Sequence, residues 1–207
     1  RRQRQMCIRD SQKRACSRAS VGILQEVSGR QLKLKMNTEK SKVASIFAQK
    51  KFKFLGFCLG RTGSGTYIRV HRKSLAKAKE KLKLLTKRNR GRNARRVMQE
   101  VKEFIRGWIG YFRAADMKRT LMSWDKWMRR RFRMYIWKQW KKPKTKVANL
   151  RKLGVPADEA YRWGNSRLGY WRIAGSHVLK CSITNERLAA VGYFSILNYY
   201  ESLHLCG

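Results

Sequence analysis

The sequence has few acidic residues, no long hydrophobic run and no paired cysteines. Its 12 Asp and Glu residues stand against 51 Lys and Arg, which gives the 207-residue chain a formal net charge of +39. No apolar stretch approaches the roughly 18 residues of a transmembrane helix, so we expect no membrane partner. The five cysteines are odd in number and never follow a Cys-x-x-Cys spacing. We therefore expect neither a disulfide framework nor a zinc site, and a reducing, cytoplasmic location.

The positive charge is concentrated in one part of a chain that otherwise has the composition of a folded protein. Residues 71–150 carry 27 basic and 5 acidic side chains, whereas residues 151–207 carry 7 and 4. Hydrophobic residues make up 43% of the chain and aromatic residues 11%, which argues against a disordered basic tail. Such an excess of cations repels itself unless a polyanion is bound. The composition predicts a folded polyanion binder; a basic protein on a membrane surface is the alternative, which the Trp-rich segments disfavour.

Hydrophobic periodicity predicts a mainly α-helical chain preceded by a small β-hairpin system, an α+β arrangement. Before residue 71 we expect a helix over 12–29 and strands over 32–36, 51–59 and 67–70, with a turn over 61–65. After residue 71 the period becomes 3.6, which is typical of helices with one apolar face. Helices are expected from a cap at Ser74 to residue 85, from Val97 to Phe112, from Met117 to Lys142 where Pro143 ends the helix, on both sides of Pro156, and from Thr184 towards Tyr199.

One predicted binding surface lies on the third of these helices, opposite its apolar stripe. Basic side chains and one Trp recur there every three or four residues and so form a row along the helix. Successive members of this row are roughly 4.5–6 Å apart along the helix axis, a spacing that suits contact with a phosphate backbone. Arginine forks bind phosphate oxygens in pairs, and an exposed Trp offers a ring on which an unpaired base can stack. We predict that this row contacts RNA; a solvated basic face with its Trp packed against a neighbouring domain is the alternative. The row consists of Lys126, Arg130, Arg133, Trp137 and Lys141.

The first of the long helices and the loop after it are predicted to bind RNA as well. Several unpaired lysines on one helix oppose its formation unless an anion neutralises them. The arginines of the loop are placed to clamp phosphates, although a disordered linker is the alternative there. The residues concerned are Lys77, Lys79, Lys81, Lys83, Arg88, Arg90, Arg92, Arg95 and Arg96.

The residues themselves predict no catalytic site and no metal site. The four aspartates of the chain are dispersed, whereas a two-metal polymerase or nuclease needs several carboxylates together. The three histidines are far apart, and Gly63-Ser64-Gly65 lacks the lysine and the following helix of a phosphate-binding loop. Taken alone, the chain is expected to bind rather than to catalyse.

Several motifs, in their order along the chain, resemble the bacterial group II intron-encoded reverse transcriptases. The stretch from Leu32 to Lys42, followed by Phe54-Leu55-Gly56-Phe57, is similar to the last two conserved blocks of the reverse transcriptase palm. The segment from about Tyr67, which ends in Gly107-Trp108-Ile109-Gly110-Tyr111-Phe112, resembles the maturase-specific domain of that family. The string Gly169-Tyr170-Trp171-Arg172-Ile173-Ala174 and residues 188–200 extend the resemblance towards the end of the chain.

The resemblance implies the C-terminal part of an RNA-directed DNA polymerase that helps its intron RNA fold and splice and then copies it into DNA. Residues 1–10 are assigned to no domain, and one explanation for them is an artefact of sequence assembly. Residues 11–70 would be the end of the palm, 71–143 the helical thumb and maturase-specific domain, and 144–207 the rest of the maturase region with a DNA-binding region. Phe54, Leu55, Gly56 and Phe57 would lie in the primer-grip strand.

The resemblance also implies partners and a cofactor for the whole protein. The partners would be group II intron RNA, template–primer, target DNA and the missing N-terminal reverse transcriptase domain. Mg²⁺ is implied for the full-length polymerase, and no cofactor is expected in this fragment.

Two departures from the family limit what this chain is expected to do. The adjacent catalytic aspartates of the family lie upstream of this sequence, which opens with Arg1, so we expect a fragment that is inactive as a polymerase on its own. Some relatives end in a zinc-bound endonuclease, whereas here the last residues lack paired ligands. We expect Phe52, Phe54 and Phe57 to expose the apolar surface against which the palm would pack. The alternative is a free-standing basic RNA or DNA chaperone, which the palm-like motifs disfavour.

Overall fold

The structure is a computed structural model that describes Glu26, residues 53–62 and residues 65–205. The chain forms two compact units, divided between Phe52 and Lys53, and the hairpin and helices below all belong to the second unit. Glu26 is helical, but the rest of the helix expected over 12–29, the strand over 32–36 and Phe52 lie outside the described residues. The finer division expected at residues 10/11, 70/71 and 143/144 stays a prediction.

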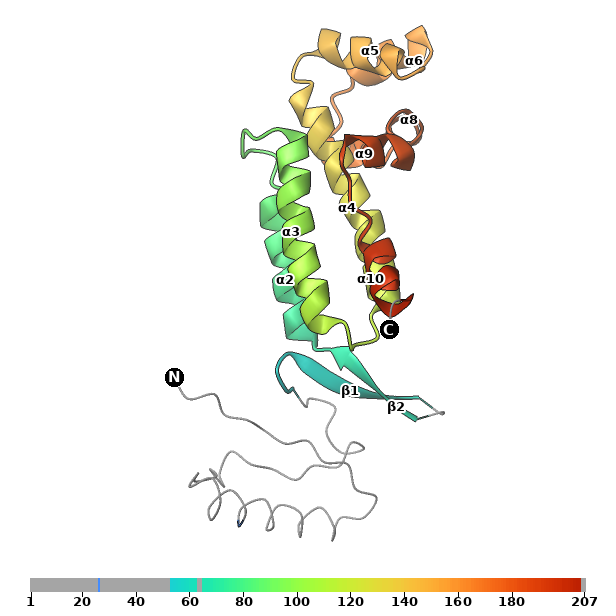
Figure 1. Cartoon of the computed structure of the whole chain (residues 1–207). Coiled ribbons are helices and arrows are strands. Elements are labelled where there is room, and N and C mark those ends of the chain that lie inside the picture. Colours follow the sequence, from blue (N-terminus) through green and yellow to red (C-terminus); the bar gives the residue numbers. More distant parts are fainter. Residues whose placement is uncertain (1–25, 27–52, 63–64, 206–207) are drawn as a thin grey trace. The chain divides into compact units, whose positions relative to one another are not determined.

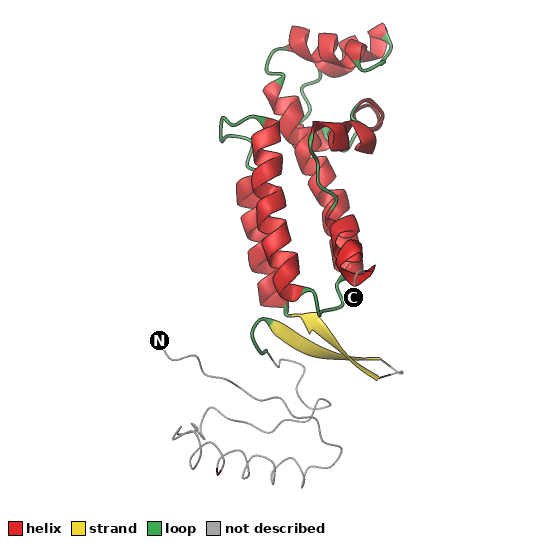
Figure 2. Ribbon diagram, in the orientation of Figure 1, coloured by secondary structure: helices red, strands yellow, loops and turns green. Residues whose placement is uncertain are grey.

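A two-stranded antiparallel hairpin precedes a set of helices (Figures 1 and 2). Strand β1 (Phe57–Thr62) pairs with β2 (Gly65–Val70) in a register that runs from Phe57 opposite Val70 to Thr62 opposite Gly65. The expected arrangement, mainly α with a small hairpin, is thus confirmed. The strand expected over 51–59 begins only at Phe57, because the residues just before it form a tight turn.

Three long helices follow the hairpin: α2 (Arg72–Leu85), α3 (Ala94–Phe112) and α4 (Lys118–Gln139). Figure 1 shows α2 and α3 side by side above the hairpin, with α4 alongside them. The cap of α2 is His71, whose Nδ1 accepts a hydrogen bond from the backbone N–H of Lys73 at 3.1 Å. Ser74, the expected cap, lies inside the first turn of α2 and donates its hydroxyl hydrogen to the carbonyl of Gly56 at 3.2 Å. The cap expected at Ser74 was therefore wrong by three residues.

Shorter helices make up the remainder of the described chain. Pro143 does not simply end α4; it begins the next helix, where the missing N–H of a proline costs no hydrogen bond. The single helix expected from Thr184 towards Tyr199 is two helices, because Gly192 adopts a left-handed φ of 110° that ends the first of them. These helices are α5 (Pro143–Lys152), α6 (Ala157–Gly164), α7 (Tyr170–Ile173), α8 (His177–Ser182), α9 (Asn185–Val191) and α10 (Ile196–Leu205).

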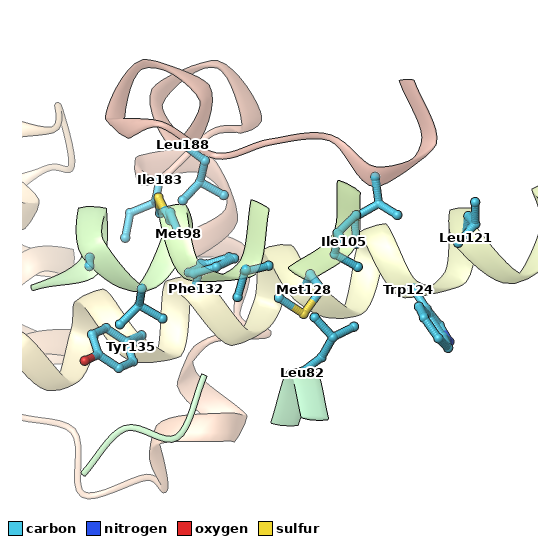
Figure 3. Packing of buried hydrophobic residues seen from close by; sticks show 14 of the residues in the cluster. Leu82, Met98, Ile105, Leu121, Trp124, Met128, Phe132, Tyr135, Ile183 and Leu188 are labelled. Carbon is cyan, nitrogen blue, oxygen red and sulfur yellow. The ribbon is translucent and has the colours of Figure 1, made fainter. Parts of the chain in front are cut away.

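The hydrophobic core is built around α4, which is covered from more than one side. Figure 3 shows Leu82 of α2, Ile105 of α3 and Met128 of α4 packed together, with Ile183 and Leu188 from the C-terminal segment close to Phe132. The apolar stripe predicted on α4 is buried at every position, as are five of the seven predicted on α3, while Phe104 and Trp108 are half-buried. Helices α7 and α10 pack against α4, so the C-terminal segment covers part of this helix in addition to the part that α2 and α3 cover.

A buried carboxylate attaches the C-terminal segment to α4. Asp125 is 3% exposed and accepts hydrogen bonds from the hydroxyl of Tyr193 at 2.6 Å and from the backbone N–H of Ile196 at 3.1 Å. Arg129, one turn further along α4, neutralises Asp125 at 2.9 Å. Burial, and then the neighbouring negative charge of Asp125, raises the pKa of Tyr193 well above its usual range. This network fixes the start of α10 against the middle of α4.

Candidate nucleic-acid interface

The four lysines predicted on α2 are all exposed and have no acidic partner among the described residues. Ala78 and Leu82 face the core, which leaves the other sides of the helix to charged side chains. The described ion pairs use Glu100, Glu201 and Asp125 as acids, and none of them reaches α2. Positive charge therefore accumulates along α2, and no ion pair among the described residues neutralises it. The lysines concerned are Lys77, Lys79, Lys81 and Lys83.

The arginines of the loop after α2 divide into structural and free groups. Arg90 and Arg92 both bind Glu100 of α3, and Arg90 also donates to the carbonyl of Leu85 at 2.7 Å. Burial acts to raise the pKa of Glu100, but the hydrogen bonds from the two guanidinium groups prevail and lower it. The loop is thus folded onto α3, so the alternative of a disordered linker is wrong.

Three further arginines near this loop keep their charge accessible. Arg88 is exposed and lies over the ring of Tyr170, 4.7 Å from its centroid. Arg95 and Arg96 are exposed on the first turn of α3, where Arg96 approaches Glu100 to no closer than 4.0 Å. These side chains extend the cationic surface of α2 at its C-terminal end.

The row predicted on α4 is not an exposed row, and this expectation was wrong for three of its five members. Lys126 and Lys141 are exposed. Arg133 is 8% exposed and donates to the carbonyl of Ile183 at 2.8 Å and to Oδ1 of Asn185 at 3.1 Å. Arg130 donates to the carbonyl of Trp171 at 2.8 and 3.2 Å. The two arginines therefore hold α7 and the start of α9 against α4.

Trp137, the expected stacking platform of that row, is 1% exposed. Lys146 of α5 lies 5.0 Å from the centroid of its ring, and Trp140 packs beside it at 5.5 Å. The ring is therefore a core residue; the alternative interpretation was right that Trp137 packs against protein, but the row is not the solvated face that it assumed. Periodicity showed that the row lies opposite the apolar stripe, but it could not show that the C-terminal helices cover that side.

Two other tryptophans, which the sequence did not single out, reach the surface beside α2. Trp127 of α4 is half-buried and Trp171 of α7 is 39% exposed. They line a depression of about 450 Å³ together with Lys79 and Lys83 of α2 and Arg131 of α4. Trp127 and Arg131 are one helical turn apart on α4, and this spacing could have predicted that the two side chains lie together. Nothing local in the sequence indicates that Trp171 lies beside them.

Of the four residues expected in a primer-grip strand, Phe54, Leu55 and Gly56 lie in a tight turn, and only Phe57 belongs to a strand, as the first residue of β1. Backbone hydrogen bonds join Phe54 and Phe57 in both directions, at 3.0 and 2.7 Å, and the two residues between them have positive φ, 47° at Leu55 and 90° at Gly56. A Cβ on Gly56 would lie 3.0 Å from the ring of Phe112. Gly56 is therefore required by both its backbone conformation and its close approach to α3.

This turn is attached to the helices. The carbonyl of Gly56 accepts from the backbone N–H of His71 at 2.8 Å, and the hydroxyl of Tyr111 donates to the carbonyl of Leu55 at 3.0 Å. Phe57 packs on Tyr111 and on Phe112, with ring centroids 5.8 and 4.9 Å apart. Phe54 and Phe57 are half-buried, so the expected exposure of these rings was wrong, whereas Leu55 is 64% exposed.

A comparison of the sequence with protein families finds a matching domain, and it covers the helices that carry these cations. Residues 75–154, which run from α2 to just past the end of α5, match the model of the group II intron maturase-specific domain. The chain carries a group II intron maturase-specific domain. A search of curated proteins finds no match to the chain. The resemblance of the helical region is thereby confirmed, and the maturase domain ties the protein to the splicing of group II introns, with group II intron RNA as its partner.

The described part of the chain shows neither a metal-binding cluster nor a helix that could span a membrane. No group of three or more His, Cys, Asp or Glu side chains among these residues is arranged to hold a metal ion. The Mg²⁺ implied for a full-length polymerase thus finds no fitting donor set here and stays a prediction about the rest of such a protein. Among the described helices, none is both long enough and apolar enough to cross a lipid bilayer.

Proposed function

We propose that the maturase domain binds group II intron RNA through the cationic surface of α2 and so assists the folding and splicing of that RNA. The observation that carries the proposal is the set of four exposed lysines on one helix with no acidic partner among the described residues. Packed phosphates of a folded RNA repel one another, and a dense row of cations lowers that repulsion. Bound RNA would in turn relieve the repulsion among the lysines.

The same surface supports the finer role that the family resemblance implies. In a group II intron reverse transcriptase, these helices would be the thumb, which binds intron RNA and holds template–primer for RNA-directed DNA synthesis during intron mobility, while target DNA would be bound by the region after about residue 144. The turn at Phe54–Phe57 is held by α2 and α3, which would couple a primer-grip element to the thumb. Polymerisation itself would reside in the missing N-terminal domain, and the cysteine pattern supports a cytoplasmic setting for the whole protein.

The test is the salt dependence of RNA binding by the full chain and by a variant in which the four α2 lysines are changed to Gln. Each phosphate neutralised contributes about −0.7 to −0.9 to the slope of log affinity against log salt. We expect a steep decline in affinity with salt for the natural chain and a slope shallower by about 3 for the variant. A matched control changes four exposed cations elsewhere to Gln: Arg151, Lys152, Arg162 and Lys180. A flat salt response, or equal effects of the two variants, would contradict the proposal.

A competition experiment separates a maturase from a general RNA or DNA chaperone. Binding to a labelled group II intron RNA is measured against an unrelated structured RNA of equal length and against a primer–template duplex. A maturase should prefer the intron RNA, because folded RNA is recognised by shape as well as by phosphate charge. Equal competition by all three would favour the chaperone.

A further inference from the structure

The depression between α2, α4 and α7 combines aromatic rings and cations in one place. Its polar lining consists of two lysines and a glutamate from α2 and an arginine from α4, and its aromatic lining of one ring from α4 and one from α7. The depression has a volume of about 450 Å³ and opens to the surface. The polar and aromatic residues of this lining are Lys79, Glu80, Lys83, Trp127, Arg131 and Trp171.

Hydrogen bonds and stacking hold both rings in place before any ligand arrives. The Arg131 guanidinium donates to the carbonyls of Lys83 and Thr86, at 3.0 and 3.2 Å, and lies 5.1 Å from the centroid of Trp127. Arg130 donates twice to the carbonyl of Trp171 and lies 4.2 Å from the centroid of its ring. The two rings are therefore positioned by arginines that are themselves fixed to backbone carbonyls, so binding would cost little ordering of side chains.

The charges around the rings favour an anionic ligand. Lys79 lies 5.5 Å from the centroid of Trp127 and, like Lys83, has no acidic partner among the described residues. Glu80 is the one carboxylate among the lining residues, against three cations. A ligand that fits must therefore present a flat π-face to a Trp ring and negative charge to the lysines, which is the chemistry of a nucleotide unit in a single strand.

We propose that this pocket takes one unstacked base of the bound RNA, with the base on Trp171 and Trp127 and the adjoining phosphate on Lys79 and Lys83. The proposal rests on the proposed function, because RNA must reach the surface of α2 for a base to enter. Stacking on a Trp ring accepts any base, so the pocket adds affinity for single-stranded segments and little sequence preference. It performs the role that the sequence had suggested for Trp137, at a different place.

The experiment compares an unstructured uridine-rich RNA strand with an abasic ribose-phosphate strand of equal length, both bound to the full chain. Trp171→Ala should weaken binding of the RNA strand by about fivefold or more and leave binding of the abasic strand unchanged, since only the former has a base to stack. Tyr161→Ala, which removes an aromatic ring that is 68% exposed and lies outside the pocket, is the matched control and should change neither. Thermal unfolding of each variant checks that it is folded.

A measurement on the natural chain keeps the proposal testable if Trp171→Ala does not fold. The RNA strand is substituted with 5-iodouridine, irradiated in complex with the protein, and the cross-linked peptides are mapped. Cross-links at Trp171 or Trp127 are expected; cross-links elsewhere and at neither Trp would overturn the proposal.

The outcomes distinguish this inference from the proposed function. If RNA binds with a steep salt dependence but Trp171→Ala affects both strands equally or neither strand, the base pocket is wrong and the cationic surface stands. If the natural chain shows no salt-dependent binding of either strand, the proposed function fails and the pocket fails with it.

Discussion

Helices α2 and α4 are both rich in basic side chains, yet they use them in opposite ways. The lysines of α2 are exposed and have no acidic partner among the described residues. On α4, Arg130, Arg131 and Arg133 donate hydrogen bonds to backbone carbonyls of other segments. One helix carries its charge to solvent, and the other uses it to join parts of the fold. A basic helix is therefore not in itself a nucleic-acid surface.

The difference follows from the residue type and from what covers each helix. A guanidinium group has five donors in a planar fork and can satisfy several carbonyls at once, whereas an ammonium group is a strongly hydrated point charge. Helices α7 and α10 pack against α4. The carbonyls of Trp171, of Ile183 and of Lys83 at the end of α2 need donors where they meet α4. The arginines meet that need. The α2 lysines, by contrast, are exposed, and among the described residues none of them has an acidic partner.

The largest effect is expected from replacing the buried arginine of α4. Arg133→Met leaves the buried carbonyl of Ile183 without its donor at 2.8 Å. The loss of a charge-assisted hydrogen bond and an unsatisfied carbonyl together should lower the free energy of unfolding by about 3 kcal/mol. Chemical denaturation of the two chains measures this difference.

Lys126→Met, an exposed site on the same helix, serves as the control for Arg133→Met. It should change the free energy of unfolding by less than about 0.5 kcal/mol. If both variants lose the same free energy of unfolding, the distinction between cations that join segments and cations that are exposed is wrong. The distinction is also wrong if the Arg133→Met chain keeps its natural stability but no longer binds RNA.

A smaller effect on the free energy of unfolding is expected from raising the pH, and its source should be Tyr193, which helps to attach α10 to α4. Unfolded tyrosine releases its proton at about pH 10, whereas burial and Asp125 keep folded Tyr193 protonated to higher pH. Above pH 10 the folded state therefore binds more protons than the unfolded state, so stability falls as the pH rises. One such group should account for about 1.4 kcal/mol between about pH 9 and about pH 11.

The measurement for this pH effect is chemical denaturation at both pH values with the natural chain and Tyr193→Phe. Tyr135 and Tyr200, whose pKa values burial also raises, contribute equally to both chains. The alkaline loss should be smaller in Tyr193→Phe; the same loss in both chains would contradict the assignment to Tyr193.

The smallest effect on stability is expected from substitutions on α2, where removing a cation should stabilise the fold instead of destabilising it. Lys77 and Lys81 are one helical turn apart and repel each other, as do Lys79 and Lys83. Lys81→Gln should raise the thermal midpoint slightly at low salt, and the gain should vanish at high salt because the repulsion is screened. Glu80→Gln, which removes the one carboxylate of α2, should lower it. A midpoint that falls for Lys81→Gln would mean that this lysine stabilises the fold.

Much of the helical part was predictable because each long helix has an apolar stripe that local periodicity reveals. The stripe from Leu121 to Tyr135 is buried throughout, and the short helices on both sides of Pro156 are present. The ends of the helices were harder to predict from the sequence, because each end depends on a single residue. His71 rather than Ser74 caps α2, Pro143 begins a helix rather than simply ending one, and Gly192 divides the last expected helix in two.

The candidate site was predictable only in its chemistry. The lysines of α2 were expected at the surface and are there, whereas Trp137 and Arg133 are buried. Trp171 reaches the pocket from a segment about ninety residues along the chain from Lys79, and no local pattern connects the two. The ring that the sequence suggested as a stacking platform, Trp137, is buried, whereas Trp127 and Trp171 reach the surface beside the lysines of α2; that either of them stacks on a base stays a prediction.

The sequence by itself determined the excess of positive charge, the helical character of the chain after residue 71 and the face that each long helix turns to the core, because these depend on composition and on spacing within one segment. Only the tertiary structure decided which cations remain free. That choice depends on whether another segment brings carbonyls and rings to a given side of a helix, and the partners of Arg130 and Arg133 lie some forty to fifty residues away along the chain.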